Sequence, residues 1–333
     1  MPSSFNHFGI IGAGAWGTAL ALALHRAGRS VSLWVFEPEL AASMAKTQEN
    51  SAYLPGIPLP SALTYVTDIR AMTACDALIL ATPAQHVRDS CRALAAANLP
   101  ASTPLIIASK GIELSSHRLM SEVCTEELPQ NPVAILSGPS FAFEVARNKP
   151  TALTLASEND SEALAQALAS PTLRIYTTDD IIGAQIGGAL KNVLAIACGI
   201  AAGKGLGENA RAALITRGLA EITRLGLALG ARMETLMGLS GLGDVVLTCS
   251  STQSRNMSLG FALGEGQELS VILSQRKTVT EGIPTAAAAL GLARRHGIEM
   301  PLVSAVDQIL RDKTSVDESI AALMGRALRN ETV

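Results

Sequence analysis

A glycine-rich turn near the N-terminus places the strongest limit on how this chain folds. Residues 12–17, Gly-Ala-Gly-Ala-Trp-Gly, match the pattern G-x-G-x-x-G. A short apolar run over residues 8–11 precedes the turn, a segment of helical composition over residues 18–27 follows it, and a second apolar run covers residues 31–36. This order predicts a β-α-β unit with the glycines at the junction of strand and helix.

Each glycine of this turn has its own chemical reason. Gly12 permits a tight turn, Gly14 lets the backbone approach a pyrophosphate, and Gly17 lets the helix and the strand pack closely. The N–H groups at the start of the helix then offer hydrogen bonds to phosphates. We therefore predict that the first part of the chain binds a dinucleotide.

The end of the second strand bears on which dinucleotide is preferred. We expect Phe36 to stack on the adenine and Glu37 to accept a hydrogen bond from a ribose 2′-hydroxyl, which would repel the 2′-phosphate of NADP. No Lys or Arg occurs between Arg29 and Lys46. These features favour NAD, with both cofactors accepted. Two alternatives stay open: Arg70 reaches a 2′-phosphate from a distance, or Glu37 merely faces solvent.

The rest of the chain changes its periodicity once. Further strands are expected at residues 76–81, 104–109, 133–137, 152–156 and 173–177, with a helix at 86–97. This alternation is typical of α/β chains with a doubly wound, Rossmann-type parallel sheet. From Asp179 or Asp180 onward we expect only helices, in a run after Asp244 and at residues 183–203, 209–229, 256–264, 284–296, 303–310 and 316–328. At 333 residues the chain is long enough for two domains. We place a dinucleotide-binding domain at residues 1–180 and an all-α substrate and catalytic domain at residues 181–333.

The apolar helix at residues 183–203 contains Lys191, followed by Asn192. A buried ammonium group is costly unless it is paired or its pKa is lowered. A lysine with a pKa near neutrality is suited to act as a general base and acid. The alternative is a lysine that extends from the edge of the helix to solvent.

Other candidate site residues stand in loops. In a doubly wound sheet, ligands bind beyond the carboxyl ends of the strands, which is where Lys110 and Ser140 fall. Asp244 and Thr248 are placed to share one helix face, or Asp244 caps that helix. Arg255, at the start of a later helix, suits a phosphate or carboxylate; the alternative is a surface arginine.

Composition and charge exclude several classes of protein. A net charge of -3 without any basic run argues against a nucleic-acid surface or a polybasic membrane patch. Residues 8–24 are uncharged, but nothing basic precedes them and glycines interrupt them, so we expect neither a signal peptide nor a membrane span. Five scattered cysteines without a C-x-x-C pair indicate reduced thiols in a cytoplasm. No metal site is expected, and a homodimer is one candidate for the oligomeric state.

Six motifs together resemble one family. GAGAWGTALA, SKGIE, SGPSFA, GGALKNVLAIA, GLSGLGDVVLTC and QSRN, in this order over nearly the whole chain, are similar to the NAD(P)-dependent sn-glycerol-3-phosphate dehydrogenases of the soluble bacterial type. The resemblance implies a Rossmann domain followed by an all-α domain. It also implies interconversion of glycerol 3-phosphate and dihydroxyacetone phosphate, which supplies phospholipid synthesis.

The resemblance further implies roles for individual residues. By it, Lys191 is the proton acceptor, and Lys110 binds the substrate and polarises its oxygen. The other implied substrate contacts are Gly138, Ser140, Asp244, Ser254, Arg255 and Asn256. The implied cofactor contacts are Ala15, Trp16, Lys110, Ala142, Arg255, Val279 and Glu281. In this scheme Asp244 orients an ammonium group and sets its pKa, and Gly187 and Gly188 let the substrate approach the helix.

Three alternatives accompany this interpretation. Residues 138–142 resemble the G-x-S-x-G turn of α/β-hydrolases, with Ser140 as nucleophile, although Ala142 replaces the last glycine. A second alternative is a non-catalytic sensor that binds the dinucleotide and a regulatory partner. That alternative does not explain why Lys110 and Lys191 occur together. Among oxidoreductases, the alternative is a reductase of another small hydroxy or keto acid with a similar two-domain build.

Overall fold

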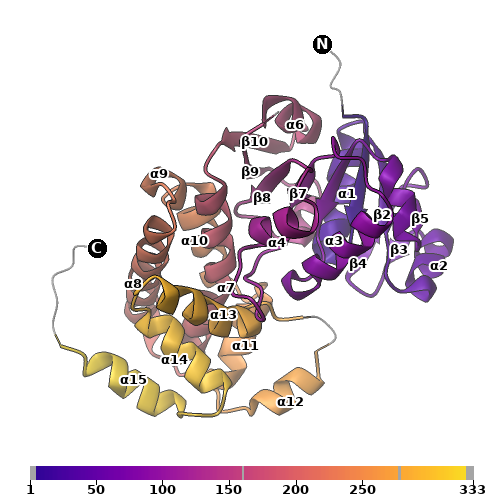
Figure 1. The fold of residues 1–333 in the computed structure, drawn as a ribbon. Coiled ribbons are helices and arrows are strands. Elements are labelled where there is room, and N and C mark those ends of the chain that lie inside the picture. The colour runs from indigo at the N-terminus through magenta and orange to yellow at the C-terminus, as the bar shows by residue number, and fades with distance from the viewer. Residues whose placement is uncertain (1–4, 160, 277–278, 328–333) are drawn as a thin grey trace. The chain divides into compact units, whose positions relative to one another are not determined.

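A computed structural model describes residues 5–159, 161–276 and 279–327. The chain forms two compact units (Figure 1). Met1–Ser109 and Met120–Ala184 make up the first, which we call the sheet unit, and Lys110–Leu119 and Gln185–Val333 make up the second, the helical unit. A ten-residue segment that lies between the two stretches of the sheet unit in the sequence therefore packs with the helices.

The sheet unit is built on an eight-stranded sheet in the order β10-β9-β8-β7-β6-β1-β2-β5. Its strands are β1 (His7–Ile11), β2 (Ser30–Trp34), β5 (Thr64–Val66), β6 (Ala77–Leu80), β7 (Leu105–Ile107), β8 (Val133–Ser137), β9 (Thr151–Ser157) and β10 (Leu173–Thr178). All neighbouring strands are parallel except β8 and β9. The doubly wound, Rossmann-type parallel sheet is confirmed, and the pair of β8 and β9 is its one antiparallel exception within the described residues. The link from β8 to β9, residues 138–150, contains only the five-residue helix α5 (Ala142–Ala146).

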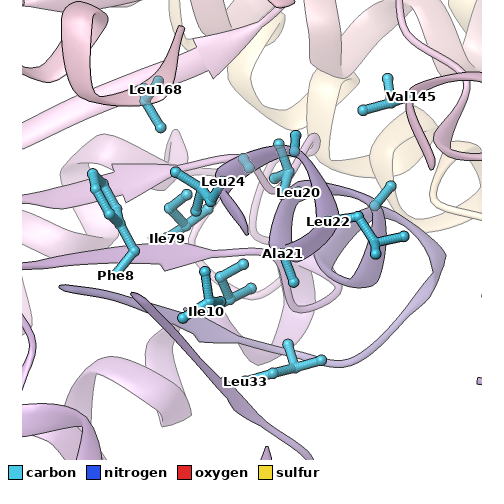
Figure 2. Close-up of a cluster of buried hydrophobic side chains, with 14 of the residues drawn as sticks. Phe8, Ile10, Leu20, Ala21, Leu22, Leu24, Leu33, Ile79, Val145 and Leu168 are labelled. Carbon is cyan, nitrogen blue, oxygen red and sulfur yellow. The ribbon is translucent and has the colours of Figure 1, made fainter. Parts of the chain in front are cut away.

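The helices of the sheet unit are α1 (Ala15–Arg26), α2 (Pro38–Thr47), α3 (Val87–Ala96), α4 (Met120–Glu127), α5 and α6 (Ser161–Leu168), with short 3₁₀ turns at Ile69–Ala74 and Ala84–His86. A core cluster joins α1 to one face of the sheet (Figure 2). It contains Phe8 and Ile10 from β1 and Leu20 and Leu24 from α1, all at most 1% exposed. Burying one such side chain contributes about 1.5–3 kcal/mol. This packing fixes the glycine-rich turn that joins β1 to α1.

The sequence did not reveal every element of the sheet unit. Helices α2, α4, α5 and α6, strand β5, and a hairpin of β3 (Glu49–Asn50) with β4 (Leu54–Pro58) were not predicted. The predicted strand at residues 31–36 ends earlier, at Trp34, so Phe36 lies in the following loop and is 74% exposed.

The helical unit begins within α7 (Ile181–Gly203), where Asp180 accepts a hydrogen bond from the Gly183 N–H at 2.8 Å. The helices that follow are α8 (Gly207–Ala228), α9 (Met233–Leu236), α10 (Asp244–Cys249), α11 (Arg255–Gly264), α12 (Leu269–Ser274), α13 (Gly282–Arg295), α14 (Pro301–Leu310) and α15 (Val316–Met324), with a π-helical turn at Leu239–Gly243. The all-α prediction is confirmed for the described residues. Residue 328, the predicted end of the last helix, lies outside them.

Helix α7 is the core of its unit. It is long and apolar enough to cross a membrane, but 89% of its most apolar stretch is buried. A Cβ atom on Gly199 would lie 2.1 Å from the Met257 carbonyl oxygen, and one on Gly260 would lie 2.0 Å from that of Ile196. The two helices α7 and α11 therefore touch backbone to backbone, which brings the start of α11 close to the middle of α7.

Candidate active site

Lys191 lies in the middle of α7 and is 8% exposed. Its ammonium group donates to Asp244 Oδ1 at 2.5 Å and to Thr248 Oγ1 at 3.0 Å. The side chain is turned into the helical unit, so the alternative in which Lys191 extends to solvent is wrong. Thr248 also donates to Asp244 Oδ1 at 3.4 Å, as expected for residues four apart on one helix face.

Asp244 holds a second lysine. Its Oδ2 atom accepts from the ammonium group of Lys110 at 2.6 Å, and the Asp244 side chain is fully buried. The N-cap of α10 is Gly243, and Asp244 binds the two lysines across the interior of the unit. The helix-capping alternative for Asp244 is therefore wrong. The cluster Lys110–Asp244–Lys191 gathers residues that are far apart in the sequence.

The cluster gives Lys191 an unusual acidity. Burial lowers the pKa of Lys191 to about 8, because the charged form loses its water. The negative charge of Asp244 raises this pKa in opposition, and the positive charge of Lys110 lowers it further. A group with a pKa near neutrality can both take up and release a proton under ordinary conditions, as general acid–base catalysis requires.

A glycine allows α10 to reach Lys191. A Cβ atom on Gly187 would lie 2.6 Å from the Ser240 carbonyl oxygen and 2.8 Å from Gly241 Cα. Gly187 thus admits the π-helical turn that precedes Asp244. The expectation that Gly187 opens the helix to substrate is wrong, because that side of the glycine is filled by protein backbone.

The start of α11 carries the expected phosphate-binding residues. Ser254 is the N-cap and accepts from the Met257 N–H at 3.3 Å. Arg255 is exposed, and partial loss of water lowers the pKa of its guanidinium while the Glu281 charge raises it. Arg276 donates to the backbone carbonyl oxygen of Arg255 at 2.8 Å. This hydrogen bond does not involve the guanidinium of Arg255.

Asn256 is buried and tied into the helical unit by both ends of its amide. Its Nδ2 donates to Asn192 Oδ1 at 3.0 Å, and its Oδ1 accepts from the Gly282 N–H at 2.9 Å. Asn256 therefore joins the residue after Lys191 to the start of α13. One Nδ2 hydrogen remains for any substrate. Glu281 is the N-cap of α13, and Val279, two residues earlier, is 48% exposed.

The glycine-rich turn of the sheet unit has the geometry of a phosphate cradle. Gly12 has φ +113°, and a Cβ atom on Gly17 would lie 1.9 Å from the Gly12 carbonyl oxygen. A Cβ atom on Gly14, the N-cap of α1, would meet nothing within 4 Å, so the space before the helix is open. Asn50 supports the turn from β3, because its Nδ2 donates to the Ala13 carbonyl oxygen at 2.8 Å.

These observations test the fit of a dinucleotide. An open helix start with a glycine-lined approach suits a pyrophosphate. Ala15 is the first residue of α1, and the indole N–H of Trp16 is buried without a hydrogen-bond partner among the described residues. The residues present are therefore compatible with NAD or NADP.

The other predicted residues of the sheet unit lie at strand ends. Gly138 has φ +142°, a conformation that favours glycine. Ser140 donates to the Gly138 carbonyl oxygen at 3.1 Å, and Ala142 begins α5. Glu37 is the N-cap of α2, and its carboxylate accepts from the Tyr53 hydroxyl at 3.1 Å.

Some supporting residues were missed from the sequence. Asn50, Asn192 and the Gly282 N–H have no motif of their own, since their partners are distant in the chain. Thr248 had a weak signal, its spacing from Asp244, but no role was assigned to it. Among the described residues no group of three His, Cys, Asp or Glu gathers as a metal site would require.

A Rossmann-type unit with a phosphate cradle, followed by a helical unit with a buried proton-transfer group, defines a dinucleotide-dependent oxidoreductase. Residues 7–163 match the family model of the NAD-dependent glycerol-3-phosphate dehydrogenase N-terminus, and residues 180–321 match that of its C-terminus. The chain belongs to the NAD-dependent glycerol-3-phosphate dehydrogenase family, which confirms the resemblance stated from its motifs.

Individual relatives agree. The chain is 52% identical over 334 residues to a glycerol-3-phosphate dehydrogenase [NAD(P)+] of Parvibaculum lavamentivorans, covering 100% of both chains. It is 51% identical over 335 residues to that of Hyphomonas neptunium, covering 100% of this chain and 99% of the relative. The crystal structure of the glycerol-3-phosphate dehydrogenase from Coxiella burnetii has a TM-score of 0.93 at 41% identity, over 97% of this chain and 99% of the other.

The family membership decides between the alternatives. The protein is an oxidoreductase that uses NAD or NADP, so the hydrolase and sensor alternatives are wrong. The bond from Ser140 to a neighbouring carbonyl also differs from the histidine pairing that a serine nucleophile needs.

Proposed function

We propose that this protein interconverts sn-glycerol 3-phosphate and dihydroxyacetone phosphate with NAD or NADP. The observation that carries the proposal is the buried Lys110–Asp244–Lys191 cluster, which provides a proton-transfer group beside a fixed positive charge. The names of the relatives support the same reaction. The bound nicotinamide supplies the hydride acceptor or donor at C2 of the substrate.

Lys191 exchanges the proton of this reaction. In the oxidation, its neutral form removes the proton from the C2 hydroxyl. In the reduction, its protonated form donates to the carbonyl oxygen, where negative charge develops. Lys110 stabilises that charge as a preorganised cation. Asp244 orients both ammonium groups and holds the pKa of Lys191 above the value that burial alone would give.

The phosphate of the substrate is bound by the start of α11. Arg255 offers a bidentate guanidinium, and Ser254 and Asn256 flank it. Gly138 and Ser140 complete the proposed substrate contacts. The alternative substrate, another small hydroxy or keto acid, gives no role to the arginine at the start of α11.

The cofactor is held mainly by the glycine-rich turn. In addition to Gly12, Gly14 and Gly17, its proposed contacts are Ala15, Trp16, Phe36, Lys110, Ala142, Arg255, Val279 and Glu281. In this proposal residues 1–180 provide most of the dinucleotide contacts and residues 181–333 most of substrate binding and catalysis, while Lys110, Gly138 and Ser140 come from the first range. The protein then supplies glycerol 3-phosphate for phospholipid synthesis in the cytoplasm, without a membrane or nucleic-acid partner; a homodimer is the oligomeric form to test.

The test follows absorbance of the reduced nicotinamide with dihydroxyacetone phosphate and, separately, with dihydroxyacetone. We expect rapid oxidation of the cofactor only with the phosphorylated substrate. Equal rates on both substrates would exclude the phosphate-binding role of α11. A lack of turnover on dihydroxyacetone phosphate with either cofactor would overturn the proposed reaction.

A further inference from the structure

The segment Lys110–Leu119, which we call the Lys110 segment, packs with the helical unit although the residues on both sides of it pack with the sheet unit. The two ends of the segment are hydrogen-bonded to each other. Ile112 and Leu119 form an antiparallel bridge, and the Glu113 N–H donates to the Arg118 carbonyl oxygen at 2.9 Å. Its first residue supplies the ammonium group on Asp244.

Helix α13 holds this segment through two contacts near its C-terminal end. Arg295 donates to the Ser116 carbonyl oxygen at 2.8 Å. Gly291 leaves room for the ring of His117, since a Cβ atom there would lie 2.3 Å from His117 Nδ1 and Cε1. His117 itself has φ +56°, a left-handed conformation that is uncommon for residues other than glycine.

The same helix is tied to the substrate-binding region at its other end. The Gly282 N–H, at the start of α13, donates to Asn256. Helix α13 thus connects the segment that carries Lys110 with the helix that carries Arg255. Contacts at the tip of the segment therefore bear on where its first residue, Lys110, is held.

We propose that Gly291 and Arg295 are positioning residues for the reaction, because they hold the Lys110 segment on α13 and so keep the Lys110 ammonium on Asp244. Neither residue touches the Lys110–Asp244–Lys191 cluster. They act through Lys110 alone. The inference rests on the proposed function, since it requires that Lys110 stabilises the substrate oxygen.

The pH dependence of the reaction reports on this role. The charged and titratable groups that act on Lys191 are Asp244 and Cys249 of α10 and Lys110 of the segment. Cys249 stays neutral, because its bond with Cys198 and its burial raise its pKa well above the usual value. Displacing Lys110 takes its positive charge away from the surroundings of Lys191. The pKa of Lys191 should then rise, because this charge lowers it.

The experiment compares Arg295→Ala with its neighbour Arg294→Ala. Arg294 is also exposed on α13, but its side chain has no hydrogen bond or ion pair within the described part of the chain. We expect Arg295→Ala to lower kcat/KM for glycerol 3-phosphate oxidation roughly threefold to tenfold, as loss of a charge-assisted bond at a partly exposed site implies. The acid limb of its pH profile should move to higher pH. Arg294→Ala should stay within about twofold, with an unchanged profile.

A second variant makes the test independent of the arginine charge. Gly291→Ala pushes against His117, whereas alanine favours the helix itself over glycine. We expect the same activity loss and pH shift as for Arg295→Ala, without a lower Tm.

Addition of Lys110→Ala separates positioning from a general structural effect. In the Lys110→Ala background, Arg295→Ala should change kcat/KM by less than about twofold, because the group it positions is gone. The proposal is overturned if Arg295→Ala behaves like Arg294→Ala, or if its loss persists undiminished in the Lys110→Ala background. Failure of the proposed function looks different, since Lys110→Ala would then leave the rate unchanged.

Discussion

The ammonium group of Lys191 lies 2.5 Å from Oδ1 of Asp244 in the interior of the helical unit. Asp244 is fully buried, and Lys110 binds its other oxygen. Two cations thus share one anion, so that the cluster is electrically balanced only when one lysine is neutral. Because Lys191 is the more buried of the two lysines, we expect it to be the one that gives up its proton.

Replacing Lys191 should abolish turnover with the fold retained. A general acid–base group contributes roughly a hundredfold to ten-thousandfold to the rate, so kcat of Lys191→Ala should fall by that factor. Lys191→Arg should be nearly as inactive, because a guanidinium does not deprotonate in proteins. Steady-state rates and Tm are measured together. A variant that keeps more than about half of the normal kcat would remove Lys191 from the mechanism.

The pH profile should follow the ionisation of Lys191. Its pKa is about 8, lowered first by burial. Oxidation needs the neutral form, so kcat/KM for glycerol 3-phosphate should rise with pH and level off above about 8. Asp244→Asn removes the charge that raises this pKa, so the acid limb should move to lower pH. An acid limb that stays in place in Asp244→Asn would show that another group controls the profile.

Arg255→Ala should weaken the capture of phosphorylated substrate. Hydrogen bonds to charged groups contribute about 1.5–3 kcal/mol each, so kcat/KM for dihydroxyacetone phosphate should fall at least about tenfold. The rate with dihydroxyacetone serves as the internal control and should hardly change. Added phosphite should accelerate the wild type on dihydroxyacetone more than it accelerates the variant. An unchanged kcat/KM for the phosphorylated substrate would rule this role out.

The loop after β2 should make NADH the better cofactor. The hydrogen bond from Tyr53 fixes the Glu37 carboxylate, which we expect to accept from a ribose hydroxyl and to repel a 2′-phosphate. We predict a higher kcat/KM for NADH than for NADPH and a smaller ratio in Glu37→Arg. Tyr53→Phe, which keeps the charge of Glu37, should change the ratio less. A tenfold preference for NADPH in the wild type would contradict the role of Glu37.

Glu221 should make the stability of the protein depend on pH. It is buried on α8 and accepts from the Leu302 N–H at 2.7 Å, and burial raises its pKa from 4.5 to about 7. Its contribution to the free energy of unfolding is therefore fully present below about pH 4.5 and is lost as the pH rises through about 7. With about 1.4 kcal/mol per pKa unit, the loss is at most about 3.5 kcal/mol.

The measurement for Glu221 is Tm against pH for the wild type and Glu221→Gln. Relative to the wild type, the variant should gain stability between about pH 5 and pH 8. Glu318→Gln is the control, because hydrogen bonds from Ser315 lower the pKa of this carboxyl and its difference should be flat over that interval. A constant difference between the wild type and Glu221→Gln would contradict the prediction.

Local patterns explain what the sequence predicted well. The glycine-rich turn and α7 were found because their pattern lies within one strand–helix junction or one helix. The hairpin of β3 and β4 was missed, since β3 has two residues and β4 contains prolines that disfavour strands. The direction of β9 depends on the link before it rather than on its own residues.

Contacts between distant residues explain what could not be predicted. Gly187 has the same sequence neighbours whether it faces a substrate or the backbone of Ser240, and only the packed unit decides. Likewise Asn256 was expected to contact the substrate, and the sequence did not show that Asn192 and Gly282 bind most of its amide. For the same reason, the sequence did not decide whether Lys191 is buried or extends to solvent.

The division of the helical unit into two stretches of sequence has a consequence for biosynthesis. A fragment that begins at Gln185 lacks Lys110, so it would bury Asp244 with one cation and without the loop that covers α13. During translation, Lys110 is synthesised long before the helices against which it packs. The contacts of the Lys110 segment with Asp244 and α13 therefore cannot form until these later residues have been synthesised.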